Sequence, residues 1–147
     1  YNSDKFRTYL LTCNGLQTNP VESQVGPVHA GGGWWGYHNA MGFLKCSSDG
    51  KKLVATLTNA NRLEMYDFDN ATGTVSNALE MAFPFPYGVE FSPDNGLLYV
   101  STLTTLAQRV LQMDLSFLQY QNQTSRQIVL LSKPVKNPLQ RFRAKPF

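Results

Sequence analysis

The sequence is poor in charge, in cysteine and in long apolar runs. Charged residues make up 16% of the 147 residues, and there are only two cysteines, Cys13 and Cys46. Two cysteines cannot form the disulfide framework of a small secreted scaffold, although one bridge between them stays open. No apolar run approaches the roughly 20 residues that a membrane-spanning helix needs, so we predict no membrane span.

The motifs of common catalytic and cofactor sites are also missing. The sequence has no Gly-x-Ser-x-Gly elbow, and Gly31-Gly32-Gly33 is not followed by the Gly-Lys-Ser/Thr of a phosphate loop. The stretch from Asp67 to Gly73 begins like a calcium-binding loop. However, Thr72 and Ala78 stand where such a loop needs Gly and Glu, so a hairpin turn is the better interpretation. We therefore predict no catalytic residue, no metal and no cofactor.

Acidic residues are absent from the last fifteen positions, 133–147, although the whole chain carries a formal charge of only +3. Such a segment can bind nucleic acid or a membrane surface, or it can be a solvated or truncated end. Only Phe142 and Phe147 supply aromatic rings among its basic residues, so we predict no nucleic-acid partner. We expect a basic tail, truncated or disordered; its charges are Lys133, Lys136, Arg141, Arg143 and Lys145.

The chain does contain an internal repeat. Residues 47–56 and 92–101 share a Ser-x-Asp turn followed by an apolar strand, at an offset of 45 positions. We expect the turn residues Asp49, Gly50, Asp94 and Gly96 to have structural roles, with each Asp accepting backbone N–H groups. A repeat of this length that holds several short strands is typical of propeller blades.

The strand pattern predicts an all-β fold, because β-branched and aromatic residues are frequent and helical apolar spacing is absent. We predict a partial β-propeller of about two and a half four-stranded antiparallel blades in residues 1–132: a blade end at 6–25, a full blade at 40–83 and a blade at 84–131. The expected strands are 6–12, 21–25, 42–46, 52–57, 62–68, Val75 with 79–81, 88–91, 97–101, 109–115 and 128–131, and 26–36 is expected to be a Gly-rich connection. Since propellers close with four to eight blades, we expect either a fragment of a longer propeller or pairing with more of the same.

Two stretches carry a resemblance to a known family: 41–76, and Pro86-Tyr87-Gly88-Val89-Glu90-Phe91-Ser92-Pro93-Asp94. Over residues 6–131 the chain resembles the WD40-like propeller of large secreted surface proteins of Bacteroidota; the tail departs from it. In that family the propeller usually precedes PKD-type modules and a gliding-motility-associated C-terminal domain read by type IX secretion. The resemblance implies a secreted or cell-surface, non-enzymatic module linked to adhesion or gliding motility. Its expected partners are a protein or a surface glycan, and the remaining blades of the parent propeller.

Trp34, Trp35, His29 and His38 form the most conspicuous polar-aromatic cluster of the sequence. Two exposed Trp rings can stack on a sugar or on a partner's side chain, so we predict a ligand- or partner-binding site here. The alternative is packing that fixes a loop between blades. Two histidines without a nearby acid at ligand spacing make a weak case for zinc.

A fragment of a lactonase-like propeller enzyme is the alternative to an interaction module. Ser-Pro-Asp-x-x-x-Leu-Tyr-Val-Ser also occurs in lactonase-type propellers, and such an enzyme would need polar residues converging from several blades. Lys45 and Glu90 occupy equivalent strand positions and are the first candidates for such a site.

Overall fold

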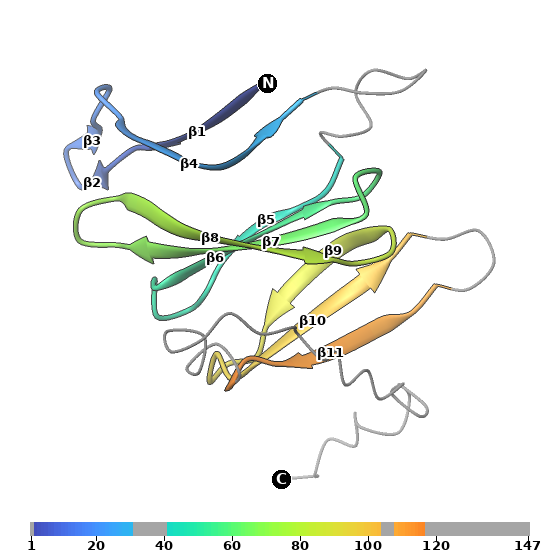
Figure 1. Ribbon diagram of the computed structural model, residues 1–147. Helices are drawn as coiled ribbons and strands as arrows, with labels where there is room; N and C mark the ends of the chain where they lie inside the picture. Colours follow the sequence, from blue (N-terminus) through green and yellow to red (C-terminus); the bar gives the residue numbers. More distant parts are fainter. Residues whose placement is uncertain (1, 31–40, 104–107, 117–147) are drawn as a thin grey trace, which may run out of the picture.

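The computed structural model describes residues 2–30, 41–103 and 108–116 (Figure 1). Within these ranges the chain forms strands and no helix, and every paired strand is antiparallel. The all-β prediction is therefore confirmed for the described residues. The strands are β1 (Ser3–Thr8), β2 (Leu11–Thr12), β3 (Gly15–Leu16), β4 (Val21–His29), β5 (Leu44–Cys46), β6 (Lys52–Leu57), β7 (Arg62–Asp69), β8 (Thr74–Ala82), β9 (Pro86–Phe91), β10 (Leu97–Thr102) and β11 (Val110–Asp114).

The central sheet has four strands in the order β5-β6-β7-β8. Val54 of β6 lies opposite Lys45 of β5 and Met65 of β7, so each strand pairs with its neighbour in the sequence. Consecutive residues of β6 and β7 are buried, so both faces of this sheet are covered, as the apolar run Leu53-Val54-Ala55 predicts. The strands follow the prediction closely, because short turns with Gly50 and Gly73 in left-handed conformations set the connections.

A second sheet has three strands in the order β11-β10-β9. Leu98 of β10 lies opposite Phe91 of β9 and Met113 of β11. These strands agree with those expected at 88–91, 97–101 and 109–115. The strand predicted at 128–131 lies outside the described residues.

The N-terminal residues form a two-stranded ribbon, β1 with β4, and a short hairpin, β2 with β3. Two predictions are wrong here. The expected strand 6–12 is divided after Thr8, and β4 continues to His29 through residues expected to be a connection. The continuation is possible because Gly26 has φ +79° and the β1–β4 register shifts between Ser3 and Lys5, which is a bulge.

The three sheets are stacked, with the central sheet between the ribbon and the β9–β11 sheet (Figure 1). One apolar cluster joins the central sheet to the β9–β11 sheet, and a smaller one joins it to the ribbon. The first contains Val54, Leu63, Met65, Met81, Phe83, Val89, Phe91, Leu98, Val100, Met113 and Leu115. The second contains Ala55, Leu57, Tyr66 and Val75, packed against Phe6, Val25, Leu53 and Phe68.

Equivalent parts of the two repeats lie side by side in this stack. Asn95 Oδ1 accepts hydrogen bonds from both the backbone N–H and the hydroxyl of Ser48, each at 3.0 Å, so one turn holds the next. Lys45 Nζ lies 2.7 Å from Glu90 Oε2, and Thr56 Oγ1 donates to the Tyr87 carbonyl at 2.5 Å. The two repeats are therefore joined directly, and Lys45 and Glu90 occupy equivalent positions in them.

Candidate functional site

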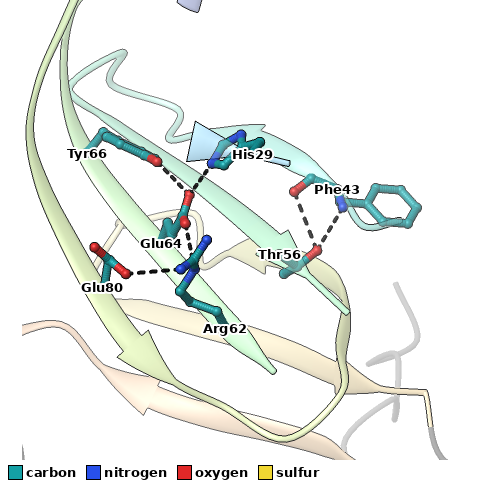
Figure 2. Close-up of polar contacts among 7 residues, drawn as sticks. All are labelled: His29, Phe43, Thr56, Arg62, Glu64, Tyr66 and Glu80. Atoms are coloured by element: carbon teal, nitrogen blue, oxygen red, sulfur yellow. Dashed lines mark hydrogen bonds and ion pairs between the residues drawn. The ribbon is translucent and has the colours of Figure 1, made fainter. Parts of the chain in front are cut away.

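The most unusual side chain of the described residues is Glu64, a carboxylate with 0% exposure on the ribbon-facing side of β7. Its Oε2 accepts a hydrogen bond from the Tyr66 hydroxyl at 2.5 Å and lies 2.6 Å from His29 Nε2 (Figure 2). His29 stands at the end of β4, so this contact joins the ribbon to the central sheet. Because a carboxylate can only accept, His29 carries a proton on Nε2 in this contact.

Arg62, at the start of β7, places its guanidinium beside the other oxygen of Glu64. Arg62 Nε lies 2.7 Å from Glu64 Oε1, and Arg62 Nη1 donates to Glu80 Oε2 at 3.2 Å (Figure 2). These two oppositely charged atoms are close together, but their geometry is poorly aligned for a hydrogen bond. Neither atom therefore has a hydrogen-bond partner within the described residues. The result is a chain of alternating charge from Glu80 through Arg62 to Glu64.

The ionisation of Glu64 follows from these neighbours. Burial by itself raises the pKa of a carboxyl group. Here the hydrogen bonds from His29 and Tyr66, together with the charges of His29 and Arg62, outweigh it and hold the Glu64 pKa below its ordinary value of 4.5. Burial and the hydrogen bond to Glu64 raise the pKa of Tyr66. Glu64 is therefore ionised and Tyr66 protonated at neutral pH.

This arrangement predicts a loss of stability in acid. Because the Glu64 pKa is lower in the folded than in the unfolded chain, its contribution is present above pH 4.5 and declines as the pH falls through the lower folded value. Urea unfolding at a series of pH values measures the free energy of unfolding. Between neutral and acid pH this free energy should fall less for Glu64→Gln than for the parent chain. An equal fall in the variant and the parent would contradict this role. Some acid sensitivity should remain in the variant, since Asp49 and Asp67 also have lowered pKa values.

The repeat shows why the site is unusual. At an offset of 47 positions, Asp114 is the equivalent of Asp67, so Glu64 and Tyr66 correspond to Leu111 and Met113. Met113 is buried in the apolar cluster between the central sheet and the β9–β11 sheet, and Leu111 packs against this cluster. The ribbon interface thus carries a polar network where the next interface is apolar. Sequence reasoning missed Glu64. The available signal was that Glu64 is a charged residue aligned with an apolar residue, Leu111, in the other repeat.

The arrangement suits anchoring better than catalysis. General acid–base chemistry needs a group within hydrogen-bond reach of a substrate, and Glu64 is enclosed by its own partners. A buried charge held by several hydrogen bonds instead fixes the relative position of the elements that supply them. We therefore interpret the network as the link that holds the end of β4 against β7.

The sequence-predicted site residues are placed unevenly. His29 lies in β4 and contacts Glu64, whereas Trp34, Trp35 and His38 lie outside the described residues. Lys45 and Glu90, the candidates for an enzymatic site, form an ion pair with each other. Both cysteines are free, Cys13 exposed and Cys46 half-buried.

The turn residues have closely similar surroundings in the two repeats. Asp49 Oδ1 accepts from the Lys51 N–H at 3.1 Å, and Asp94 Oδ1 accepts from the Gly96 N–H at 3.1 Å. In each turn the preceding Ser hydroxyl also donates to the Asp, at 2.6 Å from Ser47 and 2.5 Å from Ser92. Gly50 has φ +68°, and an added Cβ would lie 2.9 Å from the Asn70 Cβ, so a side chain there would be strained.

In residues 2–30, 41–103 and 108–116 there is no group of three or more His, Cys, Asp or Glu side chains placed to hold a metal ion. The same part of the chain contains no helix that is long and apolar enough to cross a membrane.

Comparison of the chain with models of protein families, with curated proteins and with solved structures finds no match.

Proposed function

We propose that the chain is part of a β-propeller and acts as a non-enzymatic structural and interaction module of a secreted or cell-surface protein. The observation that carries this proposal is the direct contact between corresponding parts of the two repeats: Lys45 pairs with Glu90, its equivalent, and Ser48 bonds to Asn95 in the corresponding turn. Repeated sheets that each contact only their neighbours are the architecture of scaffolds with extended binding surfaces. The family resemblance adds adhesion or gliding motility as the setting of this function.

The stacking supports a propeller in a second way. Along β6, Leu53 packs toward the ribbon and Val54 toward the β9–β11 sheet, so both faces of the sheet are covered. In the next repeat Leu98, the equivalent of Leu53, again faces the preceding sheet. Each sheet therefore turns the same face to its predecessor, as blades arranged around an axis do.

A lactonase-like enzyme is the alternative, and nothing in the described residues favours it. Its best candidates, Lys45 and Glu90, neutralise each other at 2.7 Å. The buried Glu64 is engaged by His29 and Tyr66. Both Glu90 and Glu64 are therefore already engaged by neighbouring side chains.

The partner-binding hypothesis for Trp34 and Trp35 has a direct test. Labelled protein is applied to an array of surface glycans, and binding is compared between the parent and the Trp34→Ala/Trp35→Ala variant. We expect the double variant to lose at least about tenfold in affinity with an unchanged melting temperature, because stacking aromatics dominate such contacts. Undiminished binding by a folded double variant would refute the site. A lower melting temperature would instead assign the two Trp residues to packing.

A further inference from the structure

The hairpin that contains β2 and β3 exposes large apolar side chains that no part of the described chain covers. We call residues 9–17 the apolar hairpin. Its side chains of Tyr9, Leu10, Leu11 and Leu16 are 46%, 56%, 73% and 57% exposed, and none of them belongs to either apolar cluster. Leu11 lies directly opposite Leu16, so these two side chains share one face of the hairpin.

This hairpin is also free of charge. Residues 8–21 contain no Asp, Glu, Lys or Arg, although Arg7 and Glu22 immediately flank them. Charged residues have the highest free-energy cost of transfer into the hydrocarbon core of a bilayer. An uncharged segment with several exposed Leu side chains is therefore suited to an apolar environment more than to water.

The backbone of the apolar hairpin is largely satisfied within the hairpin itself. Leu11 pairs with Leu16 and Thr12 with Gly15, the Gln17 N–H donates to the Leu10 carbonyl at 2.9 Å, and the Asn14 N–H donates to the Thr12 hydroxyl at 3.2 Å. A segment that enters the edge of a bilayer must make such internal bonds, because lipid tails offer none.

The size of the surface favours a bilayer over a protein partner. A large aromatic side chain covers about 150–250 Å², so four side chains that are roughly half exposed fall well short of the ~800 Å² per partner of a standard protein interface. Insertion into a lipid surface has no such minimum, since its strength grows with the apolar area buried.

From these observations we propose that the apolar hairpin docks the protein on the surface of a lipid bilayer. Leu10, Leu11 and Leu16 enter the boundary between headgroups and acyl chains, and Cys13 lies at the turn between β2 and β3. Attraction to anionic headgroups has no part in this contact, because the hairpin carries no cation. The proposal depends only on the hairpin and is independent of the propeller assignment.

The experiment uses Cys13 as a reporter. The full chain with Cys46→Ala is labelled on Cys13 with the fluorophore NBD and mixed with phosphatidylcholine vesicles. We expect co-sedimentation that is unaffected by raised salt, with a blue-shifted and brighter NBD emission. Leu11→Ser/Leu16→Ser should reduce vesicle affinity by more than about tenfold. The control Leu44→Ser removes a Leu of equal exposure, 57%, from β5 and should bind like the parent.

Three results would overturn the proposal. The first is no binding to phosphatidylcholine vesicles, or binding that requires anionic lipid and disappears with salt. The second is equal binding by the double variant, with melting temperatures showing that both proteins are folded. The third is a concentration-dependent dimer, seen by light scattering without vesicles and lost in Leu11→Ser/Leu16→Ser, which would assign the hairpin to a second copy of the chain.

Discussion

Replacing Glu64 by alanine is expected to lower the free energy of unfolding by about 3–5 kcal/mol, the cost of removing one partner from a buried ion pair. The variant leaves the buried Tyr66 hydroxyl without its acceptor and removes the contact of Glu64 with His29 at the end of β4. Urea denaturation at neutral pH measures the effect. His29 and Arg62 are partly exposed, at 31% and 26% of the side chain, and can turn to water, which favours the lower end of the range.

The next repeat supplies a control for this prediction. Glu64→Leu/Tyr66→Met introduces the residues found at the equivalent positions, Leu111 and Met113. Because a buried ion pair replaced by packed apolar side chains is often neutral or stabilising, the double variant should recover most of the loss seen with Glu64→Ala. If the double variant is as unstable as Glu64→Ala, the network acts through something other than its buried charge.

Leu98→Ala is expected to cost about 2–5 kcal/mol of unfolding free energy, the range for truncating a fully buried Leu. Leu98 has 0% exposure and lies in the cluster between the central sheet and the β9–β11 sheet. The cavity would weaken the contact that holds these sheets together. Thermal and urea unfolding should both report the loss.

The matched control for Leu98→Ala is Leu44→Ala, since Leu44 lies in β5 with 57% exposure. Its truncation should change the unfolding free energy by no more than about 0.5 kcal/mol, as expected of a surface position. Equal effects of the two substitutions would mean that the apolar cluster does not join the two sheets.

The strands of the two repeats could be predicted from the sequence because local signals agree there. Each Ser-x-Asp turn is followed by a run of apolar residues, and strand β6 (Lys52–Leu57) begins and ends where the pattern indicates. The prediction failed where local signals conflict. Gly26 and Pro27 are typical of a connection, yet β4 continues to His29 because a bulge and the packing of β4 against the central sheet override them.

The polar network could be predicted only in small part. The sequence singles out His29 because it lies near Trp34 and Trp35, and it gives no signal of a partner 35 positions away in the chain. Single-sequence patterns do not report which side chains two stacked sheets bring together. A comparison of the two repeats singles out Glu64 as a charged residue at an otherwise apolar position. It predicts neither the contact of Glu64 with His29 nor its complete burial.

The most direct test of the account is zero-length cross-linking of the folded monomer with a carbodiimide, which joins an amine to a carboxylate already in contact. Lys45 and Glu90 occupy equivalent positions of successive repeats and lie 2.7 Å apart at the surface. We predict a Lys45–Glu90 cross-linked peptide by mass spectrometry, beside the Lys5–Glu22 peptide expected within the ribbon at 3.1 Å. Recovery of the Lys5–Glu22 peptide without the Lys45–Glu90 peptide would contradict the stacking of the two repeats.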